Sequence, residues 1–243
     1  MDNEYNYGGP VIIVKWTRCS KNGHMPSNSE NQLQEEAMKP LGRRARKAMA
    51  VRQSLFAAGL AAFERQPIGL VSILDITEEA DVAKGVFYLH FKSKDEYLLA
   101  LWEDVQRSFL DGVRAATLEC RSRTNRIEAT VRHYAKISQD TPATARFWVR
   151  MSSYFPDEVG EPGHLARIHQ EYVQQLAATL AGQTFEALTP VDVRSALLAD
   201  SICWAVISTS ISTGESLCDD DALVRIVASA IKTSDSSRER TAG

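Results

Sequence analysis

Glycine and proline are sparse after residue 70, and few stretches look like the turns that separate β-strands. Alanine, leucine, glutamate and arginine are plentiful instead, which indicates an all-helical chain. No apolar run reaches the length of a transmembrane helix, and PVIIVKW near the N-terminus is too short for a signal peptide. We therefore expect a cytoplasmic protein without a membrane partner.

The chain also lacks the usual patterns of metal sites and catalysis. Cys19, Cys120, Cys203 and Cys218 form no C-x-x-C pair and have no histidine beside them at metal-ligand spacing, so reduced thiols are expected, with a redox switch as the alternative. The histidines and carboxylates form no H-E-x-x-H, G-x-S-x-G, P-loop or dinucleotide-binding signature. We predict no metal, no cofactor, no catalytic residue and no enzymatic activity.

Net charge is only −3, which excludes a generally basic protein that coats nucleic acid. Any contact with DNA must therefore come from a local basic patch. Between residues 41 and 54 every charged residue is basic, namely Arg43, Arg44, Arg46, Lys47 and Arg52. The alternative for this patch is a solubilising run of charge.

The stretch SILDITEEADVAKGVFYLHFKSK, residues 72–94, predicts a helix, a tight turn and a second short helix. Ser72 stands in N-cap position with Asp75 three residues on, and Ile73, Ile76 and Ala80 supply a buried face. Asp81 tolerates the turn because its side chain can bond local backbone N–H groups and the left-handed conformation costs it little.

The second helix of this stretch has two distinct faces. Val82, Val86 and Phe87 can face inward. Ala83, Lys84 and Tyr88 face outward with Gly85, whose missing side chain permits close approach. A short exposed helix of this kind fits the major groove of DNA.

The run A-x-V-x-K-G-x-x-Y-x-H-F-x-S-K within DVAKGVFYLHFKSKDEYLLAL resembles the DNA-binding signature of the TetR family of transcriptional regulators. The match covers roughly residues 48 to 105. The resemblance implies an all-α fold, in which an N-terminal three-helix helix-turn-helix DNA-binding domain is joined to a C-terminal helical ligand-binding and dimerisation domain. It also implies a homodimer.

We predict four segments. Residues 1–40 form a disordered extension or reflect a start codon assigned too early, residues 41–110 the DNA-binding domain with its connecting helix, 111–233 the ligand-binding and dimerisation domain, and 234–243 a flexible tail. A first helix is expected over 44–66, and a long one begins at a Ser93–Glu96 capping box and frays near Asp111 and Gly112. Further helices are predicted at 125–139, 142–154, 163–180, 190–212 and 219–233.

Chemistry and the resemblance together indicate a set of DNA-binding residues. Lys84 can reach phosphate or guanine, Tyr88 can donate to phosphate, and Ser72 lies at a helix N-terminus. Leu74, Ala83 and Val86 depart from the family, where polar residues are common, so Ala83 or Val86 would meet thymine methyl groups, or Val86 would be buried. The predicted DNA-binding residues are Arg43, Arg44, Arg46, Lys47, Ser72, Ala83, Lys84, Gly85, Val86, Tyr88, His90 and Lys94.

The second half contains many aromatic side chains with a few polar ones on the same helices. They form a core or line a pocket for an apolar or aromatic ligand, whose anionic head group could pair with Arg150. The predicted ligand-binding residues are His133, Phe147, Trp148, Arg150, Met151, Tyr154, His169, Tyr172, Asp200 and Trp204.

The last two predicted helices are apolar on more than one face. One face can pack in the chain's own core and the other against a symmetry mate, or both can be enclosed within one monomer. The predicted dimerisation residues are Val193, Leu197, Ile207, Ile211, Leu223 and Val227.

These features together predict a repressor that binds a double-stranded, partly palindromic DNA operator and releases it on binding a small-molecule effector. Release requires that the ligand favour a conformation in which the DNA-reading helices of the two copies are wrongly spaced for the operator. The alternatives are an enzyme that uses the C-terminal helical cavity and an architectural DNA-binding protein without ligand control.

Overall fold

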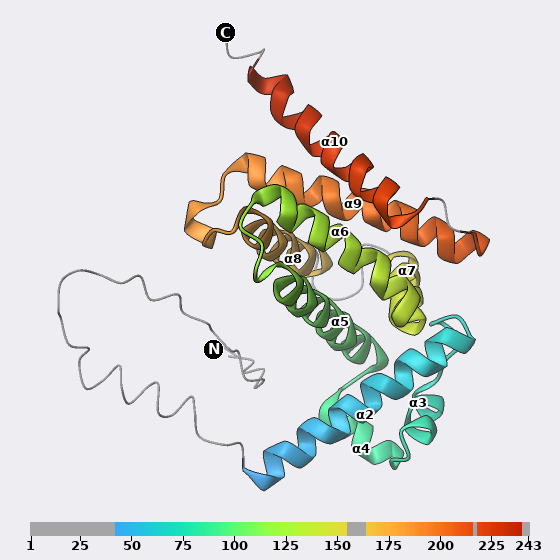
Figure 1. Cartoon of the computed structure of the whole chain (residues 1–243). Coiled ribbons are helices and arrows are strands. Elements are labelled where there is room, and N and C mark those ends of the chain that lie inside the picture. Colours follow the sequence, from blue (N-terminus) through green and yellow to red (C-terminus); the bar gives the residue numbers. More distant parts are fainter. Residues whose placement is uncertain (1–41, 155–163, 216–217, 240–243) are drawn as a thin grey trace, which may run out of the picture. The chain divides into compact units, whose positions relative to one another are not determined.

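A computed structural model describes residues 42–154, 164–215 and 218–239, and these residues form helices and connecting turns with no strand among them (Figure 1). The predicted all-α fold is confirmed. The predicted N-terminal extension and the last four residues of the predicted tail lie outside the described residues. The chain divides into two units, residues 1–51 and residues 52–243.

The first helix is α2 (Arg43–Arg65), which stops just before Pro67 as expected. Its apolar stripe is buried from Leu55 to Phe63. The residues at its N-terminal end, from Arg43 to Lys47, are exposed.

The helix-turn-helix consists of α3 (Ile73–Glu79) and α4 (Lys84–His90). The predicted capping box is present: the Ser72 hydroxyl accepts the Asp75 N–H at 3.2 Å, and the Asp75 carboxylate accepts the Ser72 N–H at 2.7 Å. These bonds hold the pKa of Asp75 below its ordinary value. Asp81 makes the turn with a φ of 52°, the left-handed conformation that the sequence suggested.

An aromatic cluster holds α4 against α2 and the start of the next helix. The rings of Phe56, Phe87, Phe91 and Tyr97 lie with centroids 5.1 to 5.8 Å apart. Tyr97 is fully buried, and its hydroxyl donates to the Leu55 carbonyl at 2.8 Å. The position of α4 is therefore set by a packed core rather than by a loop.

The connecting helix is α5 (Lys94–Thr117). The predicted capping box is only half present, because the Ser93 hydroxyl accepts the Glu96 N–H but the Glu96 carboxylate accepts the N–H of Lys92. The expected fraying near Asp111 and Gly112 is wrong. Gly112 is retained inside the helix where a Cβ would come within 2.4 Å of the His133 ring, so the predicted domain boundary at residue 110 falls within a continuous helix.

The remaining helices are α6 (Arg123–Asp140), α7 (Pro142–Tyr154), α8 (His164–Ala181), α9 (Pro190–Thr213) and α10 (Asp220–Glu239). The first four are close to the predicted ranges, whereas α10 continues beyond residue 233 into the stretch predicted to be a flexible tail. A short 3-10 turn, η1 (Phe185–Ala187), was not predicted. α6 packs against α5, α7, α8, α9 and α10, so the core of this part forms around it (Figure 1).

α9 begins at a capping box formed by Thr189 and Asp192 and ends at Gly214, whose φ is 74°. Of the described helices, it alone is long and apolar enough to cross a membrane, which is a weak indication because core helices share that composition.

Candidate nucleic-acid interface and effector cavity

The outer face of α4 carries the side chains best placed to meet DNA. Lys84, Gly85 and Tyr88 are exposed, whereas Phe87 on the opposite face is fully buried. A Cβ added at Gly85 would meet nothing within 4 Å, so this face is open. Leu89 is 82% exposed and was missed in the sequence, although its position two residues after the inward Phe87 already placed it on the outer face.

The apolar positions of the motif separate into two groups. Ala83 is exposed and is the N-cap of α4 without a side-chain cap, and Leu74 is also exposed. Val86 is half-buried, which lies between the two predicted alternatives of contact with DNA and burial in the core. Apolar side chains on this surface suit contact with thymine methyl groups.

His90 and Lys94 are both partly withdrawn from solvent. Burial is the main cause that lowers the pKa of His90, with Arg52 adding to it, so the imidazole is neutral at pH 7. The Lys94 ammonium donates to the Ile68 carbonyl at 2.6 Å and lies 5.8 Å from the centre of the Tyr154 ring. A phosphate contact by Lys94 would require its ammonium to leave this carbonyl.

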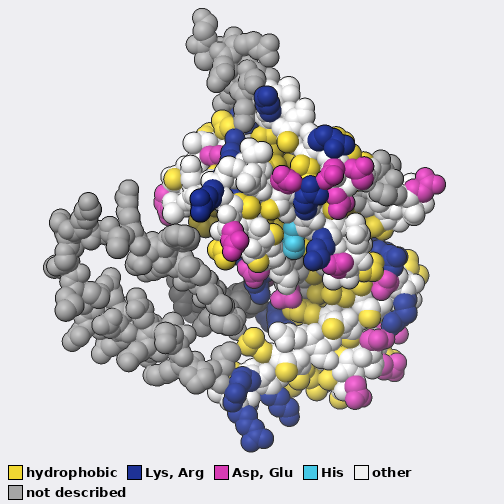
Figure 2. All heavy atoms as spheres, viewed as in Figure 1, with side chains coloured by type: hydrophobic (Ala, Val, Ile, Leu, Met, Phe, Trp, Pro, Cys, Tyr) yellow, Lys and Arg dark blue, Asp and Glu magenta, His cyan; other side chains and the backbone are white. Residues whose placement is uncertain are grey.

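The basic residues near the start of α2 differ in their surroundings. Arg43, Arg44, Arg46 and Lys47 are exposed, and Figure 2 shows Lys and Arg side chains gathered at this end of the helix. The Arg52 guanidinium lies 4.9 Å from the centroids of both the Phe56 and Phe91 rings. It therefore packs on the aromatic cluster of the helix-turn-helix.

A second aromatic cluster lies among α5, α6, α7, α8 and α9. Trp148 is its centre, with ring centroids 5.2 Å from Phe109, 5.9 Å from Tyr172 and 5.4 Å from Trp204. The cavity inside it measures only about 10 Å³ and is lined by Phe109, Tyr134, Ile137, Ala145, Trp148, Trp204 and Ile207. A space of this size holds a single water molecule at most, so a ligand must displace side chains to enter.

A buried polar network adjoins this cavity. Asp200 is 9% exposed, and its Oδ1 accepts the Tyr134 hydroxyl at 2.6 Å and the Tyr172 hydroxyl at 3.1 Å. The two phenol oxygens are 2.6 Å apart. Burial raises the pKa of Asp200 and of both tyrosines.

Three of the predicted ligand-binding residues on α7 contact α2 or the start of α5 and do not line the cavity. Phe147 stacks on Phe63 with centroids 5.5 Å apart, and the Arg150 guanidinium donates to the Phe63 carbonyl and, at 2.9 Å, to the Gln66 carbonyl. Tyr154 lies under the Lys94 ammonium. Arg150 is thus engaged at the end of α2, because helical spacing shows that a side chain shares a face but not which neighbour that face meets.

The other predicted ligand residues are at or near the aromatic cluster. Trp148 and Trp204 line the cavity, and Tyr172 and Asp200 belong to the polar network. His133 packs against Phe109, and burial is the main cause that lowers its pKa. His169 is exposed and stacks on Tyr172, whereas Met151 is buried.

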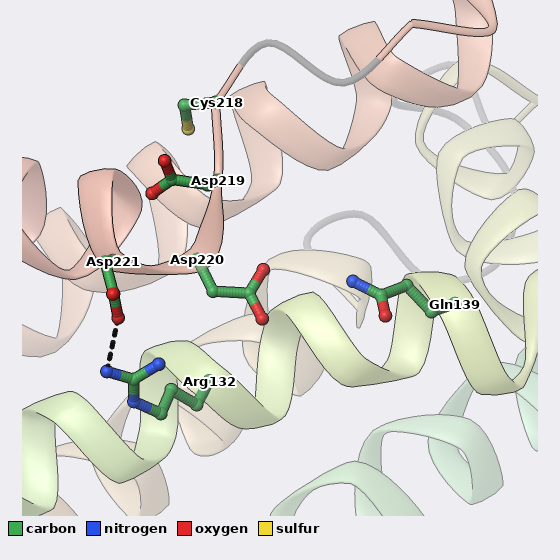
Figure 3. Close-up of a pocket in the computed structure, with 6 residues that line it drawn as sticks. All are labelled: Arg132, Gln139, Cys218, Asp219, Asp220 and Asp221. Carbon is green, nitrogen blue, oxygen red and sulfur yellow. Dashed lines mark hydrogen bonds and ion pairs between the residues drawn. The ribbon is translucent and has the colours of Figure 1, made fainter.

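A larger hollow of about 470 Å³ lies beside α6 and the start of α10 (Figure 3), and was not predicted. Its walls are Arg132, Gln139, Cys218, Asp219, Asp220 and Asp221. The three carboxylates point in different directions, and the Asp221 carboxylate pairs with Arg132 at 2.6 Å. Within the described ranges no three metal-ligating side chains converge, and these polar walls do not suit an apolar effector.

The predicted dimerisation residues are divided by burial. Ile207, Leu223 and Val227 lie in the core of this chain, so the expectation that they face a second copy is not met in this structure. Val193 and Ile211 are half-buried, and Leu197 is 40% exposed. Ile226 on α10 was not predicted and is 49% exposed.

The sequence matches the model of the family described as "Bacterial regulatory proteins, tetR family" over residues 55–101, the segment that runs from α2 through the helix-turn-helix into α5. This segment therefore resembles the DNA-binding domain of TetR-family regulators. The match supports DNA-binding transcriptional regulation, and regulators of this family are generally not enzymes. No curated protein matches the sequence.

Solved structures share the fold of this chain. The fatty acid degradation regulator FadR from Bacillus halodurans is 17% identical, with a TM-score of 0.57 over 79% of this chain and 96% of that one. FadR from Bacillus subtilis in complex with stearoyl-CoA is 15% identical, with a TM-score of 0.57 over 74% and 96%. A tetR-family regulatory protein from Rhodococcus RHA1 is 21% identical, with a TM-score of 0.53 over 75% and 95%.

Proposed function

We propose that this chain is a cytoplasmic homodimeric repressor that leaves a palindromic operator when a small apolar or aromatic effector enters the C-terminal cavity. The observation that supports it most is the exposed face of α4, which carries Lys84, Tyr88 and Leu89 on a helix fixed by the buried Phe87. A reading helix held by a rigid core can present the same side chains to every copy of the operator.

On this surface, charge and apolar contact have different roles. Lys84 would contact phosphate or a guanine edge, and the Tyr88 hydroxyl would donate to a phosphate oxygen. Leu89 and Ala83 would meet thymine methyl groups, so part of the sequence preference would come from apolar contact and DNA shape. Arg43, Arg44, Arg46 and Lys47 would add phosphate contacts, with Ser72 at the N-terminus of α3.

The test uses DNA selected by the wild-type protein from random duplexes. Lys84→Ala should lower affinity by about 10-fold or more, because a dimer loses the contact twice, and should make the salt dependence less steep. Tyr88→Phe should weaken binding less, since only one hydroxyl is removed. Lys136→Ala, which removes an exposed lysine on α6, is the matched control and should bind like the wild type.

Affinity must be measured at one fixed salt concentration, together with the dimer fraction of each variant. If both α4 variants bind as tightly as the wild type while remaining dimeric, the proposed DNA surface is refuted. Protection of one palindrome in a footprint favours a regulator, whereas broad protection favours an architectural DNA-binding protein.

α7 provides a physical route from the cavity to the DNA reader. One side of the helix contributes Ala145 and Trp148 to the cavity wall. Its other side meets the end of α2 through the Arg146–Glu64 ion pair, the Phe147–Phe63 stack and the bonds of Arg150. A ligand that displaces Trp148 would move α7 and, with it, the end of α2 and the helix-turn-helix.

The dimer would form through α9 and α10, which run side by side (Figure 1). Several apolar residues of α9, among them Val193, Ile202 and Ile211, are only half-buried within this chain and could pack against a second copy. Leu197 on α9 and Ile226 on α10 are exposed large apolar residues, which makes them the natural centre of an isologous interface.

A further inference from the structure

We propose that the aromatic cluster around Asp200 is a binding site for an apolar or aromatic ligand that carries a basic nitrogen, with Asp200 as its counter-ion. This inference rests on the proposed effector function and names the chemical class of the effector. Its basis is a carboxyl group held deep among aromatic rings without a basic partner.

Asp200 has hydrogen-bond donors but no cation. In the part of the chain that the structure describes, no ion pair joins it to lysine, arginine or histidine, and the cavity lining contains no lysine or arginine. His169, whose charge acts on Asp200, is exposed, and its ring stacks on Tyr172 with centroids 6.0 Å apart. A buried carboxylate without a cation is costly, and either a proton or a bound cation can offset that cost.

The hydroxyls of Tyr134 and Tyr172 stabilise the buried Asp200 when no ligand is bound. Three short contacts link Tyr134, Tyr172 and Asp200, but two phenols supply only two hydrogens. A protonated Asp200 would donate to one phenol, that phenol would donate to the other, and the second phenol would donate back to Asp200, so that each contact holds one hydrogen. A ligand with a protonated amine would replace that proton, since its own N–H groups can donate to the carboxylate.

The rings around the carboxyl group suit a cation as well. Phe109, Trp148, Tyr172 and Trp204 bring their rings together around the cavity, and the faces of such rings attract a positive charge. Asp200 and Trp204 are four residues apart on α9 and therefore project from the same side of that helix. An anionic head group would instead meet the charge of Asp200 and the negative faces of the rings.

Two further buried polar groups lie on the helices that wall this cluster. Among the described residues, the Gln106 amide nitrogen and the Thr130 hydroxyl have no hydrogen-bond partner, and both side chains are at least nine-tenths buried. Gln106 lies on the face of α5 that carries Phe109, and Thr130 is one helical turn before Tyr134 on α6. Unpaired buried groups are rare in folded proteins, and a polar ligand would satisfy them.

The experiment compares ligands with one carbon skeleton and three head groups, 4-phenylbutylamine, 4-phenylbutanol and 4-phenylbutyrate, by calorimetry on the full-length protein without DNA. The amine should bind roughly 10- to 100-fold more tightly than the alcohol, because one bond becomes charge-assisted, and the carboxylate should bind most weakly. In Asp200→Asn the affinities for the amine and the alcohol should become similar. Glu171→Gln, an exposed carboxylate next to Tyr172 in sequence, is the control and should keep the preference of the wild type.

The proposal is overturned if the wild type binds the alcohol or the carboxylate as tightly as the amine, or binds none of the three, or if Asp200→Asn keeps the preference. If Asp200→Asn does not fold, Trp204→Leu provides the second measurement, because loss of a ring face should lower the preference several-fold while Asp200 remains. None of these outcomes depends on DNA, so they are separate from the Lys84 test of the regulator.

Discussion

Gly59 lets the Tyr97 hydroxyl lie close against α2, and its replacement by alanine should destabilise the DNA-binding domain although alanine favours helices. A Cβ at this position would lie 1.8 Å from the Tyr97 hydroxyl oxygen and 2.9 Å from the ring carbon that carries it. Tyr97 cannot move aside, because it is fully buried and its hydroxyl donates to the carbonyl of Leu55, which lies on α2 together with Gly59.

The magnitude follows from opposing contributions to the free energy of unfolding. Helix propensity favours Gly59→Ala by about 1 kcal/mol. Overpacking a dense core costs about 1–3 kcal/mol, and a Tyr97 hydroxyl pushed off its acceptor costs about 1–3 kcal/mol more. The variant should therefore lose about 1–5 kcal/mol, the difference between these contributions.

Urea denaturation of four proteins tests this reasoning. Tyr97→Phe alone should lose about 1 kcal/mol for the missing hydrogen bond, and the double variant should be more stable than Gly59→Ala because the clashing oxygen is gone. Gly85→Ala is the matched control, since its Cβ would meet nothing within 4 Å, and it should be as stable as the wild type or more so. A Gly59→Ala protein as stable as the Gly85→Ala control would refute the argument.

Three other perturbations test the rest of the structure. Arg150→Ala should cost about 1–3 kcal/mol in urea denaturation, because two carbonyl groups at the end of α2 lose their charged donor; an unchanged midpoint contradicts this contact. Leu197→Glu should shift the protein from dimer to monomer in sedimentation, and a variant that stays dimeric would show that the interface does not include this part of α9. The lowered pKa of Asp75 adds stability that is present above its unfolded pKa and is lost as the pH falls through its folded pKa, so Asp75→Asn should differ from the wild type at pH 7 and converge with it in acid, once the pH is below the folded pKa of Asp75. A gap that persists in acid would argue against the capping box.

Much of the DNA-binding domain could be predicted because its signals are local. Ser72 and Asp75 cap a helix through bonds that span three residues, and Asp81 makes its turn through its own backbone conformation. The alternation between the buried Phe87 and the exposed Tyr88 likewise follows from the geometry of one short helix.

The residues of the effector cavity and of the dimer face could not all be predicted, because their burial depends on contacts between helices that no single helix specifies. Arg150 and Phe147 lie on an apolar helix with Trp148, yet they meet α2 while Trp148 lines the cavity. Ile207 had the same apolar spacing as Leu197, but the neighbours of α9 bury the first and leave the second exposed.

The sequence by itself determined the all-helical class, the helix-turn-helix and its outer face, because capping, turn conformation and helical period act within a few residues. Only the tertiary structure decided that Lys94 holds the Ile68 carbonyl, that Arg150 closes on the end of α2, and that Asp200 shares its oxygen with two tyrosines. These partners are 26 to 84 residues apart in the chain, and the packing of several helices, not the period of any one of them, brings them together.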